Sequence, residues 1–338
     1  MFDSSVSYIS RAVETGQSRL IQRAIRQTTS LRHDIDRTHL SNIINRYLPT
    51  TCAVYSVVND SINKMPLCDT LVVESTTIPT TILPEVEVYL LHLVIVALLS
   101  AKLYEDAAYA SSMIVEHIKQ YNKRTLDCLT AKVYYYFSLS HEKIKKLENI
   151  RSVIMTAYQT ACYHNDAMCQ STLLNLLIHN YFEYNLIEQI QILTEKTNIF
   201  SNAGSESSFV SHNQYCRYAY YIGRANAIQL EYSSSYALLS MALRKSPQEV
   251  AFGFTTQTTK LIILVQLLMG GIPERSIFNH TNMEVRTALI PYLYLTQAVR
   301  TGNIQQFQHI ANHTIYKLVF KTDKNMSLVQ RLGHNVLK

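Results

Sequence analysis

The residues of this chain that could do chemistry form short patterns, each of which lacks a component. His141-Glu142 begins like the zinc-protease motif H-E-x-x-H, but Lys145 stands where the second histidine is required. His309 and His313 lie four residues apart on a predicted helix, yet no third ligand follows at a useful spacing. Because zinc needs three or four protein ligands, the sequence predicts no metal site.

The sequence also contains no motif for a catalytic nucleophile or for a phosphate-binding loop. Cys162, His164 and Cys169 lie on one predicted helical stretch, where offsets of two and five residues turn them to different sides. No glycine pattern matches G-x-G-x-x-G or G-x-x-x-x-G-K, and no G-x-S-x-G turn occurs. The sequence therefore predicts no catalytic residue and no cofactor, and nothing in it favours an enzyme.

The elements that would hold such residues are predicted to be helices throughout. No proline stands between Pro84 and Pro247, and Gly204 and Gly223 are the glycines of that span. Pro84 itself suits the first turn of a helix, and Glu85 follows at the positive end of its dipole. Inter-helix turns are predicted near Tyr104, His141, Tyr184, Tyr232, Gly270 and Gly302, at spacings of about 32 to 48 residues that are typical of helical-hairpin repeats. The fold class is therefore all-α, a solenoid of degenerate hairpins.

Three further segments have a predicted structure. A helix is predicted from about Leu289, with Pro291 in its first turn and Gly302 at its end. The apolar run 86–99 is too short for a membrane span and predicts a buried helix. The stretch 48–83 contains three prolines and Thr-rich patches, which indicate a linker.

Composition indicates a folded protein of a reducing compartment. Of 338 residues, 47% are hydrophobic and 17% are charged, which is ordinary for a globular chain. No signal peptide opens the sequence, so the cysteines are expected to be free core thiols; they are Cys52, Cys68, Cys128, Cys162, Cys169 and Cys216. The net charge is +6, with many arginines before residue 47. These are interpreted as a solvated helix face opposite Ile21 and Ile25.

The strongest local signal is the hairpin 216–247, which follows the tetratricopeptide (TPR) pattern W-x2-L-G-x2-Y…A-x3-F…P. Ala219 and Asn226 miss its two aromatic positions. Small residues are expected where the two helices cross, and a proline is expected after the second helix. The predicted structural positions are Ile222, Gly223, Ser235, Leu239, Ala242 and Pro247, with Gly302 later in the chain. Such a unit cannot bury its apolar face alone, so it predicts stacked neighbours and a scaffold.

Six segments together resemble a known family. They are LPEVEVYLLHLVIVALL (83–99), RTLDCLTAKVYYYFSLSHE (124–142), STLLNLLIHNYFEYNL (171–186), YYIGRANAIQLEYSSSYALLSMALRKSPQ (220–248), PYLYLTQAVRTGN (291–303) and RLGHNVLK (331–338). In order and spacing they are similar to the family of non-ATPase regulatory subunit 3 of the 26S proteasome, which belongs to the PCI group. Residues 1–82 match that family poorly.

The resemblance implies a fold and a domain organisation. It implies a right-handed solenoid of TPR-like hairpins that leads into the helical part of a PCI domain. The implied parts are a divergent helical region and linker (1–82), TPR-like repeats (83–215) and the helical portion of the PCI domain (216–338). Because the chain stops at Lys338, about where the family's winged helix begins, that module is expected to be absent.

The resemblance also implies a function and partners. The implied function is a non-catalytic scaffold of the regulatory lid in ubiquitin-dependent degradation, cytoplasmic and nuclear. Its implied partners are PCI and MPN lid subunits, the proteasome base and a small acidic disordered lid subunit, with no nucleic acid and no membrane. Possible contacts to the acidic partner are Arg224, Arg244, Lys245 and Arg300.

Two alternatives remain open. One is a PCI scaffold of the COP9 signalosome or of translation initiation factor 3. The other is a peptide-binding TPR co-chaperone, which would need clustered basic residues in a concave groove, whereas the basic residues here are scattered.

Overall fold

Every secondary-structure element in the described part of the chain is a helix, as the sequence predicts. The structure is a computed structural model that describes residues 2–31, 37–47, 55–64, 83–197, 211–247 and 250–336. Most of the predicted linker 48–83 lies outside these ranges. The chain divides into two compact units, Met1–Asn180 and Tyr181–Lys338, and the division falls within one helix. The predicted domain boundaries after residues 82 and 215 stay predictions.

In the N-terminal unit, several helices pack against one apolar helix, α5. Its elements are α1 (Phe2–Thr15), α2 (Ser18–Leu31), α3 (Arg37–Tyr47), α4 (Tyr55–Asn63), α5 (Pro84–Ser100), α6 (Tyr104–Ile118), η1 (Arg124–Leu126), α7 (Asp127–Ile144), α8 (Leu147–His164) and α9 (Ala167–Glu183). Helix α5 begins at Pro84 and is buried from Glu85 to Leu98, which confirms the predicted start and the predicted burial. Helices α1, α3, α4, α6 and α7 all pack against it.

Helix α2 shows why the arginine-rich start of the chain is compatible with a folded helix. Ile21 and Ile25 are buried, whereas Arg19, Arg23 and Arg26 are exposed, as the sequence predicts. On the buried face, the hydroxyl groups of Thr28 and Tyr89 of α5 share a hydrogen bond of 2.9 Å.

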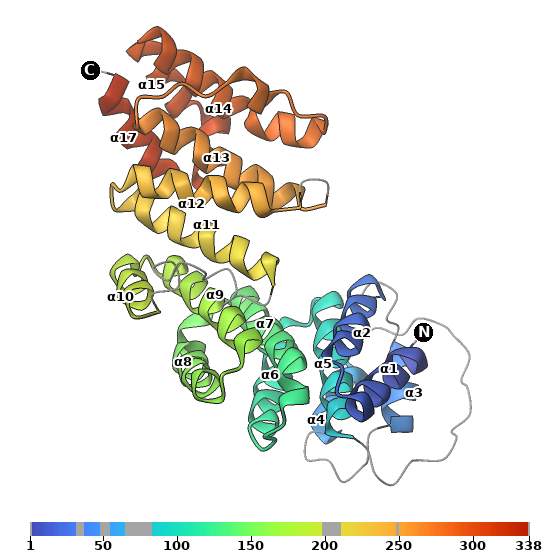
Figure 1. The fold of residues 1–338 in the computed structure, drawn as a ribbon. Coiled ribbons are helices and arrows are strands. Elements are labelled where there is room, and N and C mark those ends of the chain that lie inside the picture. The colour runs from blue at the N-terminus through green and yellow to red at the C-terminus, as the bar shows by residue number, and fades with distance from the viewer. Residues whose placement is uncertain are drawn as a thin grey trace. The chain divides into compact units, whose positions relative to one another are not determined.

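The C-terminal unit is a stack of helices that lie side by side (Figure 1). Its elements after the end of α9 are α10 (Ile187–Thr197), α11 (His212–Ile228), α12 (Tyr232–Lys245), α13 (Phe252–Leu268), η3 (Arg275–Phe278), α14 (Met283–Thr301), α15 (Ile304–Asn312), α16 (Thr314–Thr322) and α17 (Met326–Val336). Helices α11 to α15 pack in chain order, and α17 returns to pack against α13 and α15.

Two predicted element boundaries are wrong. Helix α14 begins at Met283 and not near Leu289, because the Asn282 side chain caps it by accepting from the Glu284 N–H at 2.9 Å. Pro291 consequently lies inside the helix. Helix α7 also continues beyond His141 to Ile144.

Burial corrects one expectation about the cysteines. Cys128, Cys169 and Cys216 are buried free thiols, but Cys162 is exposed on α8. Cys52 and Cys68 lie outside the described residues. No helix in the described ranges is long and apolar enough to cross a membrane.

Candidate functional site

The hairpin of α11 and α12 places its small residues at the helix crossing. A Cβ atom on Gly223 would lie 2.8 Å from Cγ and 3.0 Å from Cδ2 of Leu239, closer than real Cβ contacts allow. From α12, the Ser235 hydroxyl donates to the Gly223 carbonyl oxygen at 2.6 Å. Ser235 and Leu239 are both fully buried. The close approach of the two backbones therefore depends on the missing side chain of Gly223.

The other predicted positions of this hairpin lie around the same crossing. Ile222 and Ala242 are buried on α11 and α12. Pro247 is exposed and follows Ser246, the C-cap of α12, whose N–H donates to the Ala242 carbonyl oxygen at 3.1 Å. That all these residues serve assembly stays a prediction.

Gly302 lies at the joint of α14 and α15. It has φ 65°, in the left-handed region that suits glycine, and its N–H donates to the Val299 carbonyl oxygen at 3.2 Å. The next N–H, that of Asn303, donates to the Ala298 carbonyl oxygen, which completes a Schellman motif. The Asn303 side chain in turn accepts from the Gln306 N–H at 3.1 Å and caps α15.

The four predicted cationic contacts do not form one set. Arg224 lies 5.4 Å from the Phe182 ring centroid and donates to the Lys324 carbonyl oxygen, while Lys245 lies over the Tyr215 ring at 4.6 Å. Arg244 and Arg300 are exposed at the last turns of α12 and α14. Two of the four side chains are thus already engaged within the chain.

Helices α14 and α16 both carry exposed basic and apolar side chains. No acidic residue occurs between Glu284 and Asp323. In this stretch Tyr294, Ile315 and Leu318 are 40%, 63% and 63% exposed. The exposed cations among them are Arg286, Arg300 and Lys321.

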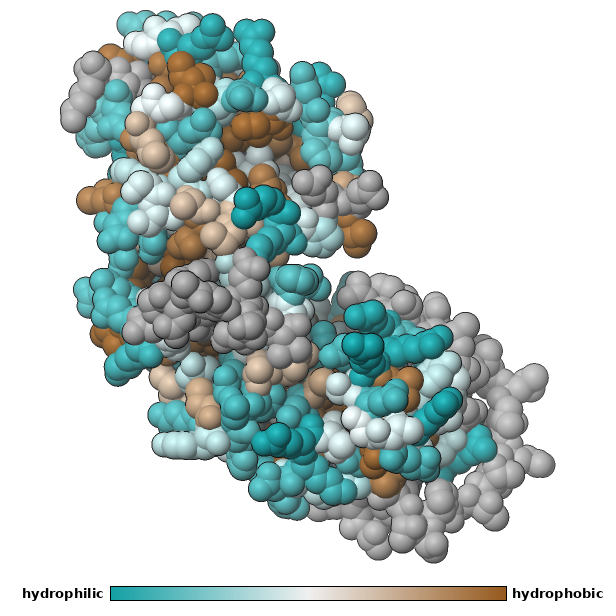
Figure 2. Space-filling model, viewed as in Figure 1, coloured by the Kyte–Doolittle hydropathy of each residue, from teal (hydrophilic) through white to brown (hydrophobic). Residues whose placement is uncertain are grey.

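The exposed basic and apolar side chains of α14 and α16 are referred to together as the α14–α16 face, and the two helices are in contact through one pair of rings. The rings of Tyr294 on α14 and Tyr316 on α16 lie 6.0 Å apart. Figure 2 shows apolar side chains in several separate places over the C-terminal unit, between hydrophilic ones. Neither the sequence pattern nor the resemblance predicted the α14–α16 face, although the lack of acidic residues is a signal that the sequence contains.

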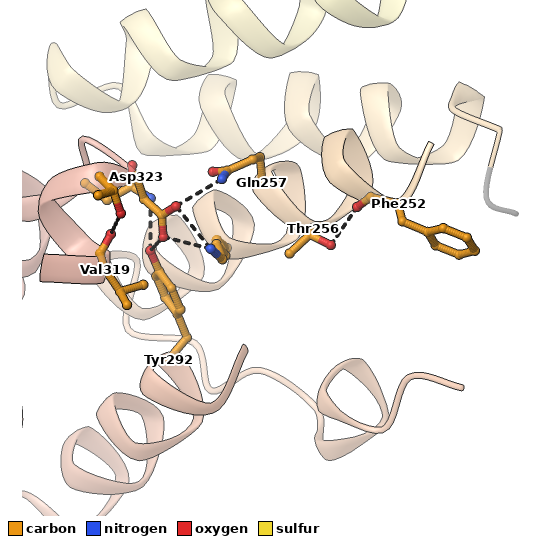
Figure 3. A network of polar contacts seen from close by, with 9 residues as sticks. Phe252, Thr256, Gln257, Tyr292, Val319 and Asp323 are labelled. Carbon is orange, nitrogen blue, oxygen red and sulfur yellow. Dashed lines mark hydrogen bonds and ion pairs between the residues drawn. The ribbon is translucent and has the colours of Figure 1, made fainter. Parts of the chain in front are cut away.

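A buried polar cluster around Asp323 was also missed by sequence reasoning. Lys260 and Gln257 of α13 and Tyr292 of α14 all donate to its carboxylate (Figure 3). Burial, followed by the charge of Asp323, raises the pKa of Tyr292, so the phenol stays protonated and donates its hydrogen. The sequence signal that could have indicated a buried partner is Lys260, which directly precedes the apolar segment 261–268.

The histidines and cysteines with suggestive spacing are separated by helix ends. Helix α8 ends at His164 and Asn165 takes φ 55°, so Cys162 and Cys169 lie on different helices, contrary to the sequence prediction. His309 is on α15, but His313 is the residue between α15 and α16. No group of three or more His, Cys, Asp or Glu side chains in the described ranges could hold a metal ion.

The environment of Cys169 disfavours a thiolate. Burial and the neighbouring charge of Asp166 raise the pKa of this thiol. Its Sγ lies 3.4 Å from the Asp127 carbonyl oxygen, to which it donates. Cys169 also lines a groove of about 920 Å³ together with Asp127, whose pKa burial and the Asp166 charge raise to about 6. The thiol therefore packs as a protonated group.

Comparisons with known proteins extend the similarity to nearly the whole chain. A family described as "PSMD3-like, N-terminal TPR repeats" matches residues 4–296. The chain is 36% identical to the 26S proteasome non-ATPase regulatory subunit 3 of Dictyostelium discoideum, over 99% of this chain and 66% of that protein. It is 33% identical to the probable 26S proteasome regulatory subunit rpn3 of Schizosaccharomyces pombe, over 99% of this chain and 66% of that protein.

A plant relative shows the same extent of similarity. The chain is 36% identical to the probable 26S proteasome non-ATPase regulatory subunit 3 of Nicotiana tabacum, over 98% of this chain and 67% of that protein. The chain therefore spans about two thirds of the length of these relatives. The expectation that residues 1–82 match the family poorly is wrong, because the family match begins at residue 4 and the similarity to the Dictyostelium discoideum protein covers 99% of this chain.

Proposed function

The chain belongs to the PSMD3-like family of 26S proteasome regulatory subunits, and from this membership we propose that it is a non-catalytic scaffold of the regulatory-particle lid. In this role it acts in ubiquitin-dependent degradation through protein–protein contacts, in the cytoplasm and the nucleus. The observation that carries the proposal is the family match over residues 4–296. Stacked hairpins provide the extended surfaces that such a scaffold uses.

The geometry of the hairpins supports a role in holding other proteins. The contact of Gly223 with Leu239 fixes how α11 crosses α12, and each further helix packs on the previous one. The position of an exposed side chain therefore depends on the whole stack below it. A stack of this kind presents several docking surfaces in the order of the chain.

The partners that we propose are other lid subunits of the PCI and MPN types, the proteasome base and a small acidic lid subunit. The α14–α16 face supports the last of these. It combines Arg286, Arg300 and Lys321 with exposed Ile315 and Leu318, and no acidic residue lies between them in the sequence. Such a surface favours an acidic segment that also carries apolar side chains.

The domain organisation that we propose follows the family. In this organisation residues 1–82 are a divergent N-terminal helical region and linker, residues 83–215 are TPR-like repeats, and residues 216–338 are the helical portion of a PCI domain. The hairpin of α11 and α12 is then the first element of the PCI portion.

Native mass spectrometry of the complex purified through the tagged full chain tests this function. We expect other lid subunits to be recovered with the chain in a fixed ratio. Recovery of signalosome or initiation-factor subunits instead would favour the alternative PCI scaffold, and recovery of the chain alone would overturn the scaffold proposal.

A matched pair of variants connects the test to the structure. Gly223→Trp places a large side chain against Leu239, so we expect it to abolish recovery of the lid subunits. Gly253→Trp is the control, because a Cβ atom at Gly253 meets nothing within 4 Å. Equal recovery with both variants would show that the α11–α12 crossing does not matter for assembly.

A further inference from the structure

The turn between α16 and α17, residues 323–325, is anchored to side chains that precede Asp323 by 31 to 66 residues. The Asp323 carboxylate accepts from Lys260 Nζ at 2.8 and 3.1 Å, from Gln257 Nε2 at 3.0 Å and from Tyr292 Oη at 2.9 Å. Figure 3 shows Gln257 and Tyr292 reaching Asp323 from two different helices. The acceptor capacity of the carboxylate is thus largely used.

The ion pair of this turn is buried. The side chains of Lys260 and Asp323 are 7% and 6% exposed. Removing one member of such a pair leaves an uncompensated charge in the interior, whereas removing both charges costs far less. The ion pair therefore stabilises the turn while both charges are present, and the loss of one charge strongly destabilises it.

The other two residues of the turn are also bound. The Lys324 carbonyl oxygen accepts from Arg224 Nη2 at 3.2 Å, and the Lys324 ammonium group pairs with Glu183. Asn325 Nδ2 donates to Tyr292 Oη at 3.2 Å. The turn thereby joins α16 and α17 to the end of α9, to α11, to α13 and to α14.

Helix α17 continues this pattern at the ends of two other helices. Arg331 Nη1 donates to the Ile228 carbonyl oxygen at 2.8 Å, and Asn335 Nδ2 donates to the Leu268 carbonyl oxygen at 3.0 Å. Ile228 and Leu268 are the last residues of α11 and α13. Carbonyl groups there have no intrahelical partner, so α17 supplies the missing donors.

The buried apolar side chains of the same segment belong to the core of the C-terminal unit. Phe320 is the buried residue of α16, and Leu328, Val329 and Leu332 are buried on α17. Ile315 and Leu318 of α16 point to solvent. Tyr316 and Met326 pack partly buried against the same core, and the polar turn lies at the bend between α16 and α17.

We propose that α16 and α17 form a helical hairpin that docks on α11–α15 and undocks from it as one unit, with the Asp323 turn as the closing contact. Undocking exposes the four apolar side chains and frees the carbonyl ends of α11 and α13, while those helices stay folded. The chain then has a docked and an undocked state, and a partner that binds either state selectively shifts the balance between them.

Hydrogen exchange of the full chain, followed by mass spectrometry, tests the proposal. In Asp323→Asn, which leaves the Lys260 ammonium group buried without its carboxylate, we expect exchange of α16 and α17 to increase about tenfold or more. Exchange of α11 and α12 should not change. Adding Lys260→Met to Asp323→Asn should restore most of the protection, because both charges are then gone. The amide oxygen of the asparagine at position 323 can still accept a hydrogen bond.

The matched control is Lys321→Met, which removes the charge of an exposed lysine on α16. We expect it to leave the exchange pattern unchanged. Two results would overturn the proposal. One is an unchanged exchange rate in α16 and α17 of Asp323→Asn, and the other is an equal increase throughout α11–α17.

Native-state exchange of the unmodified chain at low urea concentrations keeps the proposal testable if a variant fails to fold. Amides of α16 and α17 should then share one opening free energy that is lower than that of α11 and α13. Opening of α13 together with α17 would contradict the existence of a separate unit.

Discussion

At the scale of single residues, His92 shows how burial fixes a protonation state. It is 2% exposed on α5, its ring lies 5.0 Å from that of Tyr136, and its Nδ1 has no hydrogen-bond partner. Burial, with a smaller contribution from the charge of Lys132, lowers the pKa of His92 to about 3. The imidazole is therefore neutral in the folded chain.

The first prediction is that acid destabilises the N-terminal unit through His92. Unfolding returns the pKa to about 6.5, so the unfolded state binds a proton between pH 6.5 and pH 3 that the folded state does not bind. The contribution of neutral His92 to the free energy of unfolding is present above about pH 6.5. It decreases as the pH falls through this window, by roughly 2 kcal/mol between about pH 7.5 and pH 5. Urea unfolding at both pH values measures this loss.

His92→Leu should remove that part of the pH dependence, and the same substitution at the exposed His164 should not. A pH dependence that is identical in the two variants would contradict the role of His92.

Single residues also show what the sequence could predict. Gly302 was recognised as a helix end, because a glycine before an asparagine that caps the next helix is a local signal. The contact of Lys260 with Asp323 could not be recognised, since the two residues are 63 positions apart and nothing local connects them. Helix caps can therefore be predicted from a single sequence, whereas contacts between side chains of distant helices cannot.

At the scale of elements, the crossing of α11 and α12 is set by one glycine. The second prediction is that Gly223→Ala destabilises the chain by roughly 1–2 kcal/mol. The added methyl group would lie 2.8 Å from Leu239 Cγ, and the cost of overpacking exceeds the gain in helix propensity of about 1 kcal/mol. Thermal or urea unfolding measures the change.

Gly253→Ala is the matched substitution for this prediction. Its new methyl group meets open space on α13, so it should be neutral or slightly stabilising. Combining Gly223→Ala with Leu239→Ala should cost less than the sum of the two single changes, because the smaller side chain makes room. Additive effects would show that the two residues do not compete for the same space.

The predicted helix boundaries were right where helix propensity and packing agree. They were wrong where a capping residue sets the end of the helix. Pro84 starts α5 as expected, but the start of α14 was placed near Pro291 because proline prefers a first turn. The cap at Asn282 begins the helix earlier, and the proline is tolerated inside it. Similarly, Asn165 ends α8 through a left-handed conformation that the apolar pattern alone did not indicate.

At the scale of the whole molecule, the proposed binding of an acidic partner should depend on particular basic side chains and not on the net charge of +6 alone. The third prediction is that the triple change Arg286→Glu, Arg300→Glu and Lys321→Glu weakens binding of the small acidic lid subunit about tenfold or more. The α14–α16 face then repels the partner instead of attracting it. Isothermal titration at two salt concentrations measures the affinity, and the difference should shrink at high salt.

The control is a second triple variant that changes the net charge by the same amount but in a different part of the chain. Lys143, Lys145 and Lys146 are exposed at the end of α7 and beyond it, and their replacement by Glu should leave the affinity nearly unchanged. Equal loss with both triple variants would mean that net charge alone governs binding.

The sequence predicts the whole molecule less completely than its parts. The lack of prolines predicted an all-α chain, and six segments indicated the family. The division of the chain within α9 was not predicted, because contacts between distant helices decide which helices form one compact unit. The return of α17 to α13 and α15 has the same cause.

The joint of α14 and α15 limits how the length of this chain can change. Gly302 ends one helix, and Asn303 already caps the next, so no spare residue lies between them. One inserted residue that extended α15 backwards would rotate its side chains by about 100° around the helix axis. Phe307, which is buried among the C-terminal helices, would then leave its place in the core. Homologues should therefore vary in residue type at this joint more readily than in the number of residues.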